Sequence, residues 1–338
     1  VDLFGRFGII TAGKRRSSGS YLYSENEETA MNGREAEMKK ALIIGSAAAG
    51  VTIRIRRLPK SGEDVNVLSQ TLGLGGCACN VARVIRRFGV PVTLFAPIGS
   101  GVYGDFVREA LQREGLSSPI PPVPEPNGCC ICIVEESGER TFLSHHGAEY
   151  RFRREWFRLI APGEYQFAYV CGLELEEETG GAIADFLAEH PRLSVFFAPG
   201  PRCRKIPEGV LERVFGCSPV LHLNQNEALE LSGERSVPAA ARALSSRTRN
   251  AVIVTLGADG AYCLGNGIEA QIPGFPARAV DTNGAGDAHC GAVLAGTALG
   301  VPLCEAVRRA NRIAAEAVSA EGAALSAERF EAAMQSPV

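Results

Sequence analysis

Between residues 167 and 256 the sequence alternates short apolar runs with segments of helical pattern, and this alternation restricts the possible folds more than any other feature. Four runs predict buried strands, and two segments between them predict helices: 167–171, 195–198, 220–223 and 251–256 for the strands, 181–188 and 239–244 for the helices. Strands that alternate with helices form a parallel sheet joined by right-handed crossovers. Ligands bind such a sheet beyond the carboxyl ends of its strands, so we expect an α/β fold with its functional residues along that edge.

Polar residues follow several of these strands. Glu174 lies beyond the first strand, Asn224 and Glu227 lie beyond the third, and Thr255 and Gly257 lie beyond the fourth. Asn caps helices and Glu favours their first turn, so the Asn-x-x-Glu pair taken alone could simply begin a helix.

The apolar run at 41–45 predicts the first buried strand of a domain that we place at residues 38–338. Residues 1–37 are polar and dotted with glycine, which predicts an extension outside the core. Within it, residues 8–14 match the beginning of a P-loop, but Arg15 stands where Ser or Thr would bind Mg²⁺. We therefore assign this segment no role in nucleotide binding.

Two stretches, about 51–72 and 129–144, alternate polar with apolar residues and so predict strands with one exposed face. We expect them to form a small sheet that projects from the main body as a lid. The exposed edges of such a sheet favour pairing with a second copy, so a homodimer through the lid is expected. His145 and His146 end the second stretch, but two adjacent histidines without a third ligand are a weak indication of a metal site.

Composition argues against several other classes of protein. The net charge of −3 leaves no electrostatic footprint for nucleic acid or an anionic membrane. No apolar run is long enough to span a bilayer. The eleven cysteines are odd in number and no regular spacing organises them, which favours a reducing compartment. We therefore expect a cytoplasmic protein without nucleic-acid or membrane partners.

Residues 280–287, with the sequence Val-Asp-Thr-Asn-Gly-Ala-Gly-Asp, precede an apolar segment of helical composition. Asp281 and Thr282 could end a strand, and Gly284 and Gly286 permit backbone geometries that a side chain would block. The helix that follows would offer unpaired N–H groups to an anion such as a phosphate. Asp287 lies inside that anion site, where it could cap the helix or accept the proton of a hydroxyl that attacks the phosphate.

Residues 73–80 form a second glycine-rich stretch that leads into a helix with an apolar face. Gly73, Gly75 and Ala78 have the spacing of a dinucleotide fingerprint. However, the strand before them alternates, and the next strand lacks the acid that would hold a ribose. Taken alone, the stretch is therefore interpreted as a plain helix start.

The motif at 281–287 resembles the C-terminal signature of the ribokinase-like, or PfkB, carbohydrate kinases, and the order of predicted elements is similar over roughly residues 40–330. The resemblance implies a three-layer, Rossmann-like α/β domain with a small β-sheet lid. It implies ATP and Mg²⁺ as cofactors, a sugar or nucleoside as the acceptor, and, as in several members, a monovalent cation such as potassium.

The resemblance also implies roles for individual residues. The catalytic group would be Asp287 with the N–H groups of Gly284, Ala285 and Gly286. Nucleotide-binding residues would be Asn224, Thr255, Gly257, Gly260 and Asn311. Magnesium would lie near Asn224 and Glu227. A monovalent cation would be held by Asp281, Asn283, Ala317, Ala320, Gly322 and Ser326. Substrate-binding residues would be Gly50, Gly75, Gly76, Asn80, Glu174 and Asp287.

Two positions depart from the pattern of the family. Gly50 stands where members usually carry an Asp that binds sugar hydroxyls, and Cys77 stands where the members closest to ribokinase carry Lys. We therefore expect ATP-dependent phosphorylation of a hydroxyl on a sugar or sugar-containing molecule, with altered acceptor recognition. A nucleoside kinase of the same fold and a catalytically poor nucleotide or sugar sensor are the alternatives.

Overall fold

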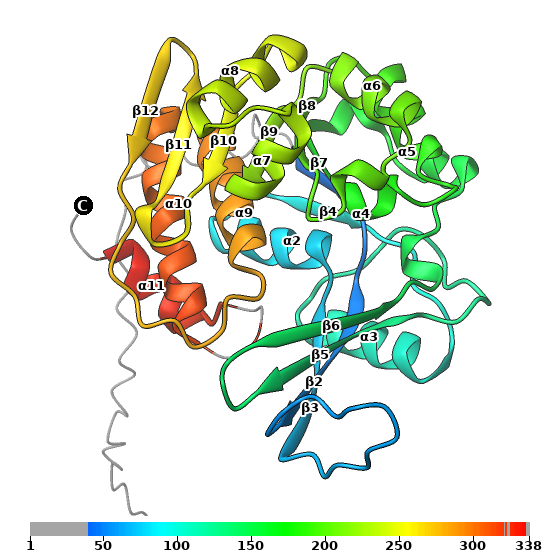
Figure 1. Cartoon of the computed structure of the whole chain (residues 1–338). Helices are drawn as coiled ribbons and strands as arrows, with labels where there is room; N and C mark the ends of the chain where they lie inside the picture. The colour runs from blue at the N-terminus through cyan, green and yellow to red at the C-terminus, as the bar shows by residue number, and fades with distance from the viewer. Residues whose placement is uncertain (1–39, 321, 323–324, 336–338) are drawn as a thin grey trace, which may run out of the picture. The chain divides into compact units, whose positions relative to one another are not determined.

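The computed structural model describes residues 40–320, 322 and 325–335, which belong to a compact unit spanning Lys39–Val338 (Figure 1). The predicted extension at residues 1–37, with its partial P-loop match, lies outside the described residues. In the described part of the chain, eight strands form the main sheet in the order β12-β11-β10-β9-β8-β7-β1-β4. Their bounds are β1 Lys40–Ile44, β4 Val92–Phe95, β7 Tyr165–Cys171, β8 Ser194–Ala198, β9 Val220–Asn224, β10 Val252–Thr255, β11 Ala261–Gly265 and β12 Ile268–Ile272.

The strands from β4 to β10 run parallel, as the alternation predicts, and only β11 and β12 are antiparallel to their neighbours. Helices cover both faces of this sheet (Figure 1). Their bounds are α2 Cys77–Arg87, α3 Gly101–Arg113, α4 Gly172–Leu175, α5 Gly181–Glu189, α6 Glu208–Gly216, α7 Gln225–Ser232, α8 Val237–Thr248, α9 Ala285–Ala298, α10 Leu303–Val318 and α11 Ala327–Gln335. The predicted three-layer α/β fold is therefore confirmed.

The alternation of side chains along each strand decides which residues can reach the site. In β7, Ala168 and Val170 belong to the apolar core that includes helices α5, α6 and α8. Tyr169 and Cys171, one residue out of phase, point to the opposite face, where α2 packs against β7 and α9 packs against α2. The functional residues described below lie on this second face and at the carboxyl ends of its strands.

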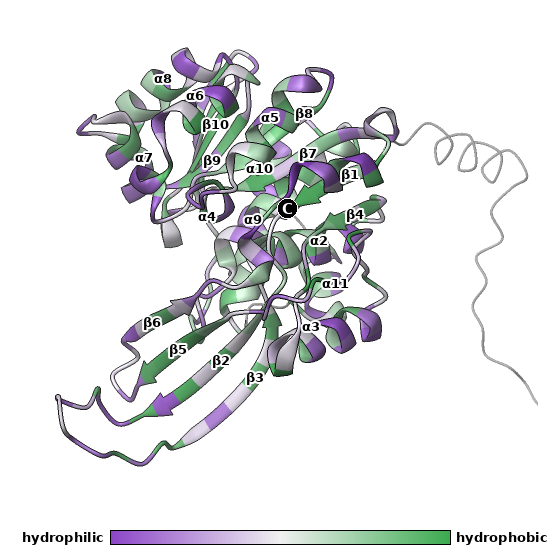
Figure 2. Cartoon of the chain, turned by 90° about the vertical axis from the view of Figure 1, so that its right-hand side faces the viewer, coloured by the Kyte–Doolittle hydropathy of each residue, from purple (hydrophilic) through white to green (hydrophobic). Residues whose placement is uncertain are grey.

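A second sheet of four strands, in the order β3-β2-β5-β6, projects from the main body (Figure 2). Its strands are β2 Ala48–Ile55, β3 Ser69–Gly75, β5 Cys129–Glu135 and β6 Arg140–His145, and β2 and β5 pair in parallel. The small second sheet that the alternating stretches predict is therefore present, and its action as a lid stays a prediction. Exposed apolar side chains lie on this sheet, at Leu72, Phe142 and Leu143, and in the loop between β2 and β3, at Val65, Val67 and Leu68.

The predicted strand ending at Asp281 and Thr282 is wrong. The backbone N–H groups of Val280 and Asp281 both donate to the carbonyl of Val318, at 2.7 and 3.0 Å, so this segment is anchored on the end of α10 instead of on a sheet. In the described part of the chain, no helix combines the length and the apolar character that crossing a membrane would require.

Candidate active site

The motif at 280–287 begins helix α9, as the sequence predicts. Gly284 adopts the left-handed conformation, with φ of 75°, directly before the helix. This glycine turns the chain so that the N–H groups of the first helical turn, which have no acceptors within a helix, face outward. Asp287 lies in that first turn. The arrangement places a carboxylate beside an anion-binding helix end.

Asp287 is held by a side chain from a distant helix. Asn80 of α2 donates from Nδ2 to Oδ2 of Asp287 at 2.8 Å. The two helices approach closely because α9 has a glycine at the contact: a Cβ atom on Gly291 would lie 3.0 Å from Cβ of Val84. Burial raises the pKa of Asp287 to about 6, although hydrogen bonds from Asn80 and Cys77 oppose the shift. The carboxyl group is therefore a proton acceptor poised near neutral pH.

The start of α2 requires glycine for a steric reason. Gly76 has φ of 97°, and a Cβ atom there would lie only 2.4 Å from the carbonyl oxygen of Ser46. Gly75 pairs with Ala48 in the lid, so the turn joins lid and helix. Asn80, predicted to bind substrate, lies one turn farther along and binds Asp287. Its Oδ1 atom is buried without a hydrogen-bond partner.

Further unpartnered polar atoms lie on the same face of the sheet. Among the described residues, the buried atoms Ser46 Oγ, Tyr169 OH and Glu174 Oε2 also lack a hydrogen-bond partner. Glu174 is fully buried, and its Oε1 accepts from the backbone N–H of Ser46 at 2.8 Å. Burial raises the pKa of Glu174 to about 7. Unsatisfied buried polar atoms are rare in folded proteins, and these atoms keep hydrogen-bonding capacity that water or a ligand could use.

Of the two positions that depart from the family pattern, Cys77 lies close enough to Glu174 and Tyr169 to interact with them electrostatically. Gly50 of β2 pairs with Gly73 of β3, so neither strand presents a side chain at that level. Contact with Cys171, together with burial, raises the pKa of the Cys77 thiol, which therefore stays protonated and donates to Asp287. A neutral thiol thus occupies the position where the pattern of the family has a cation.

A cleft of about 290 Å³ opens on the other side of the N-terminus of α9. It brings together several residues predicted to bind nucleotide, which are Thr255, Gly257, Gly260 and Asn311, with Ala285 and Gly286 of the helix start. Asn311 lines the cleft, but its amide is already engaged. It donates to the carbonyls of Ile272 and Pro273, at 3.0 Å each, so it orders the backbone of the cleft wall.

Asn311 ends a buried chain of side chains that sequence reasoning missed. His289 Nε2 lies 3.0 Å from Asn311 Oδ1, and His289 Nδ1 lies 2.8 Å from His222 Nε2. Burial lowers the pKa of His289 to about 4 and holds the pKa of His222 well below its usual value, so both rings are neutral. The only sequence signal is a histidine two residues after Asp287. These side chains link β9, helix α9 and the cleft wall without any charge.

Asn224 and Glu227 form a capping box at the start of α7. The Asn224 side chain accepts from the backbone N–H of Glu227, and the Glu227 carboxylate accepts from the N–H and the Nδ2 atom of Asn224, at 3.0 and 2.7 Å. The structural interpretation of this motif is therefore confirmed. Magnesium binding stays a prediction. Each carboxylate oxygen keeps a lone pair that can accept a hydrogen bond from metal-bound water, so the donor set fits a hydrated Mg²⁺.

The loop before α9 contains the residues predicted to hold a monovalent cation. Asp281 accepts from the backbone N–H groups of Asn283 and Gly322, at 2.7 and 2.9 Å. Its carboxylate also forms an ion pair with Arg140, which comes from strand β6 of the lid. Ser326 Oγ accepts from the N–H of Arg329. Cation binding by Asp281, Asn283, Ala317, Ala320, Gly322 and Ser326 stays a prediction.

His146 belongs to a polar network and not to an open ligand set. Its Nδ1 atom lies 2.6 Å from Glu177, and its Nε2 atom lies 2.9 Å from Arg202. Arg202 also pairs with Glu176. His146, Glu176 and Glu177 are close enough to share a metal, but an arginine directed at the second ring nitrogen opposes a cation there. Stacking of the ring on Tyr150 completes a rigid wall beside Ser46.

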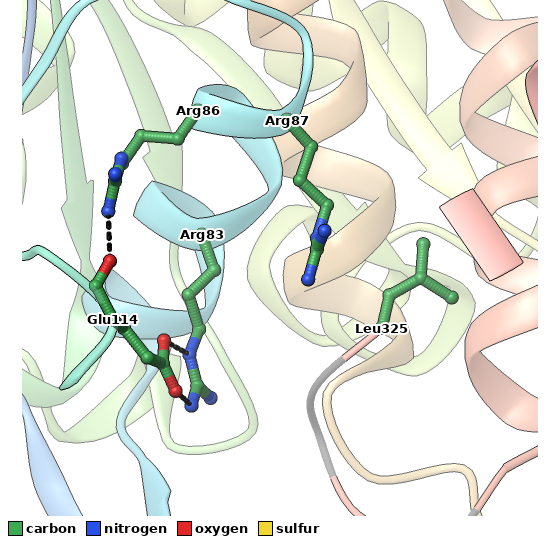
Figure 3. A pocket seen from close by; sticks show the side chains of 5 residues that line it. All are labelled: Arg83, Arg86, Arg87, Glu114 and Leu325. Atoms are coloured by element: carbon green, nitrogen blue, oxygen red, sulfur yellow. Dashed lines mark hydrogen bonds and ion pairs between the residues drawn. The ribbon is translucent and has the colours of Figure 1, made fainter. Parts of the chain in front are cut away.

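A separate cavity of about 490 Å³ lies on the outer side of α2 and is lined by three arginines, Glu114 and Leu325 (Figure 3). Arg83 pairs with the Glu114 carboxylate and donates to the carbonyl of Leu74, at 3.0 Å. Arg86 donates to the Glu114 carbonyl at 2.6 Å. These contacts tie α2 to the end of α3 and to strand β3 of the lid.

Comparison with known proteins places these features in a family. Residues 38–329 match the pfkB family of carbohydrate kinases. An uncharacterized sugar kinase of Escherichia coli K12, YegV, is 34% identical over 289 residues, which cover 84% of this chain and 90% of that protein.

Solved structures share the fold. A ribokinase from Thermotoga maritima has a TM-score of 0.77 and 24% identity, and the match covers 88% of this chain and 100% of the ribokinase chain. A nucleoside kinase from Burkholderia thailandensis, solved with inosine, has a TM-score of 0.71 and 22% identity, covering 86% and 95%. A putative ribokinase II from E. coli, solved with ATP and Mg²⁺, has a TM-score of 0.73 and 20% identity, covering 88% and 99%. Because the family match spans nearly the whole described unit and a sugar kinase shares a third of its residues, the chain belongs to the pfkB family of carbohydrate kinases.

Proposed function

We propose that this sugar kinase transfers the terminal phosphoryl group of ATP to a hydroxyl of a sugar or sugar-containing small molecule, with Asp287 as the general base. The observation that carries the proposal is the position of Asp287. It lies at the helix end that borders the 290 Å³ cleft. It is also close enough to Tyr169 and Cys77, on the side of the unpartnered polar atoms, to raise their pKa values.

The chemistry follows from this placement. The acceptor hydroxyl would give its proton to the Asp287 carboxylate as its oxygen forms the new bond to phosphorus, and ADP would leave. With a pKa of about 6, Asp287 is mostly ionised at pH 7. The N–H groups at Gly284, Ala285 and Gly286 would stabilise the negative charge on the transferred group, since they are fixed before the reaction begins. The partly buried site and the lid would limit access of water, which would otherwise accept the phosphoryl group.

Support for ATP as the donor comes from the cleft and from the E. coli relative solved with ATP and Mg²⁺. Thr255, Gly257 and Gly260 would lie along the nucleotide, and Asn311 would keep the opposite wall in place. Glu227 and Asn224 would hold the hydration shell of Mg²⁺, which neutralises triphosphate charge when it is bound. Glu227 acts electrostatically on Asp287, which is consistent with both groups facing one reaction centre.

The acceptor is expected to differ from free ribose. A carboxylate that binds two sugar hydroxyls would contribute about 1.5–3 kcal/mol for each charge-assisted hydrogen bond, and Gly50 cannot make them. Gly50 also leaves space at its own position, because a Cβ atom there would meet only the carbonyl oxygen of Gly73, at 3.6 Å. We therefore infer a larger or differently hydroxylated sugar. A nucleoside is the second candidate, because the nucleoside kinase solved with inosine shares the fold.

The exposed apolar side chains of the lid support a homodimer that forms through this sheet. Light scattering coupled to gel filtration measures the mass directly. Replacing Leu143, which is 54% exposed, with Glu should yield monomers if the lid is the interface. A dimer that survives this change would place the interface elsewhere.

The deciding experiment is a panel of sugars and nucleosides, assayed for ADP production with Mg-ATP. At least one acceptor should release ADP at a rate that depends on its concentration, and the Gly50→Asp variant should gain activity on simple pentoses while losing it on that acceptor. If ribose is already used with kcat/KM of about 10⁴ M⁻¹s⁻¹ or more, the inference about the acceptor is wrong. Tight nucleotide or sugar binding with no turnover on any acceptor would favour the alternative of a sensor.

A further inference from the structure

The loop that leads into α9 is held by one carboxylate. Asp281 accepts from the N–H of Asn283 at 2.7 Å on Oδ1 and from the N–H of Gly322 at 2.9 Å on Oδ2. The first contact fixes the turn that leads to Gly284 and therefore sets the direction of the N–H groups that would face a phosphate. The Asp281 side chain is only 13% exposed, so its charge needs a nearby partner.

Arg140 supplies that partner from the lid. It is the first residue of β6, at the end of the lid hairpin that lies beside the loop before α9 (Figure 1). Its Nη1 atom pairs with Asp281 Oδ1, and its Nη2 atom lies 3.4 Å from the carbonyl of Val280. The Arg140 side chain is 16% exposed, so both charges are largely withdrawn from water. Burial alone would raise the pKa of Asp281, but hydrogen bonds from Arg140, Gly322 and Asn283 hold it below its ordinary value.

These contacts do not fit a monovalent cation bound directly to Asp281. Oδ1 accepts from Arg140 and from the N–H of Asn283, and Oδ2 accepts from the N–H of Gly322. An N–H group cannot act as a ligand to a cation, and the guanidinium charge would repel a second cation placed beside it. The carbonyl of Ala317 accepts from the N–H of Ala320, and Ser326 Oγ accepts from the N–H of Arg329. A bare cation would have to displace Arg140 from its partner.

We propose that Arg140 acts as a tethered cation: its guanidinium supplies, from the lid, the positive charge at Asp281 that the resemblance assigns to a monovalent ion. Nucleotide binding and turnover then require no potassium or sodium. Arg140 is a positioning residue, because it acts on the phosphate-binding turn through Asp281. The part of the proposal that concerns turnover rests on the proposed kinase function, whereas the part that concerns nucleotide binding does not.

Nucleotide binding provides a test that is independent of turnover. The affinity for Mg²⁺ with a non-hydrolysable ATP analogue is measured by calorimetry in potassium, sodium or tetramethylammonium chloride at equal ionic strength. Wild-type affinity should stay within about twofold across the three salts. Arg140→Ala should bind about tenfold more weakly in tetramethylammonium and regain most of the loss in potassium, because a free ion can then reach Asp281. A tenfold change corresponds to about 1.4 kcal/mol.

Three further variants separate charge from structure. Arg140→Lys keeps the charge and should show no dependence on the salt. Arg56→Ala removes another lid arginine, one that is exposed, and should behave as wild type. The double variant Arg140→Ala with Asp281→Asn removes both charges, so its affinity should not respond to potassium. If circular dichroism shows that Arg140→Ala is poorly folded, the salt dependence of wild type and of Arg140→Lys still tests the proposal.

The proposal is overturned if wild-type affinity rises tenfold when potassium replaces tetramethylammonium, or if Arg140→Ala behaves as wild type in all three salts. It is also overturned if Arg140→Lys acquires the potassium dependence expected for Arg140→Ala. Failure of every acceptor in the ADP assay would refute the proposed kinase function. It would leave the calorimetric result, and with it the assignment of Arg140, to be judged separately.

Discussion

Replacing Asp287 with Asn should make the protein more stable as well as less active. The structure raises the pKa of this carboxyl from 3.8 to about 6, mainly through burial. A shift of about two units corresponds to about 3 kcal/mol at most, at about 1.36 kcal/mol per unit. Because Asp287 is only partly buried, solvent screening reduces this to about 1–2 kcal/mol. Asn at this position can still accept from Asn80 but carries no charge to desolvate.

The pH dependence of the gain follows from the direction of the shift. A carboxyl whose pKa is higher in the folded state destabilises the ionised folded protein, so the penalty is absent below about pH 4 and complete above about pH 6. The variant should therefore match wild type near pH 4 and exceed it at pH 8 by a few degrees in Tm, at about 2–4 °C per kcal/mol. Turnover should fall by about 10²–10⁴.

Thermal unfolding between pH 4 and 8, monitored by circular dichroism, measures the gain, and Asp64→Asn in the exposed lid turn is the control. If Asp287 only stabilised the start of the helix, Asp287→Asn would be expected to lower the stability of the protein and not to raise it. If Asp287 mainly complemented the helix dipole, its replacement would lose about 0.3–1 kcal/mol at pH 8. A variant that is less stable than wild type at pH 8, or a gain that does not change with pH, would refute the reasoning.

Three other variants test neighbouring parts of the site. Asn80→Ala removes a hydrogen bond to the ionised Asp287, so the acid limb of the pH–rate profile should move upward from about 6; an unmoved limb would separate Asn80 from the base. Glu227→Gln should raise the Mg²⁺ concentration for half-maximal rate more than it lowers Tm, and an unchanged requirement would remove Glu227 from the metal site. Gly76→Ala should lower the unfolding free energy by about 1–3 kcal/mol in urea titrations, because alanine is strained at a positive φ and its Cβ would meet a backbone oxygen. Gly209→Ala is the control: its Cβ would have open space, so its unfolding free energy should not fall in this way.

The layered architecture could be predicted because parallel strands buried on both faces appear as continuous apolar runs, and the lid could be predicted because its strands alternate. The hairpin of β11 and β12 was missed although its signal is present. Asn266 and Gly267 both have positive φ, at 54° and 76°, as a two-residue turn of type I′ requires. The wrong strand before Asp281 has a different cause: its backbone is satisfied by the end of a helix that occurs later in the chain.

The contacts between residues of the site could not be predicted from local sequence patterns. Asn80 and Asp287 are 207 residues apart, and Arg140 and Asp281 are 141 residues apart. Each residue type is common on a helix or a strand edge, so nothing in the neighbouring sequence distinguishes it. The contacts arise because Gly291 lets α2 approach α9 and because the lid hairpin reaches the loop before α9. Such juxtapositions are properties of the folded chain as a whole.

Asn224 and Glu227 of the capping box and Asp287 would respond differently to mutation if the protein lost its activity. Asn224 and Glu227 stabilise a helix start whether or not the protein is active, so selection for folding alone would retain them. Asp287 is the reverse case, because its buried charge opposes folding and its loss would be favoured once activity no longer mattered. A lineage that drifted toward a sensor would keep the Asn-x-x-Glu motif and shed the aspartate. Asp287 is present in this chain, as the proposed role of general base requires.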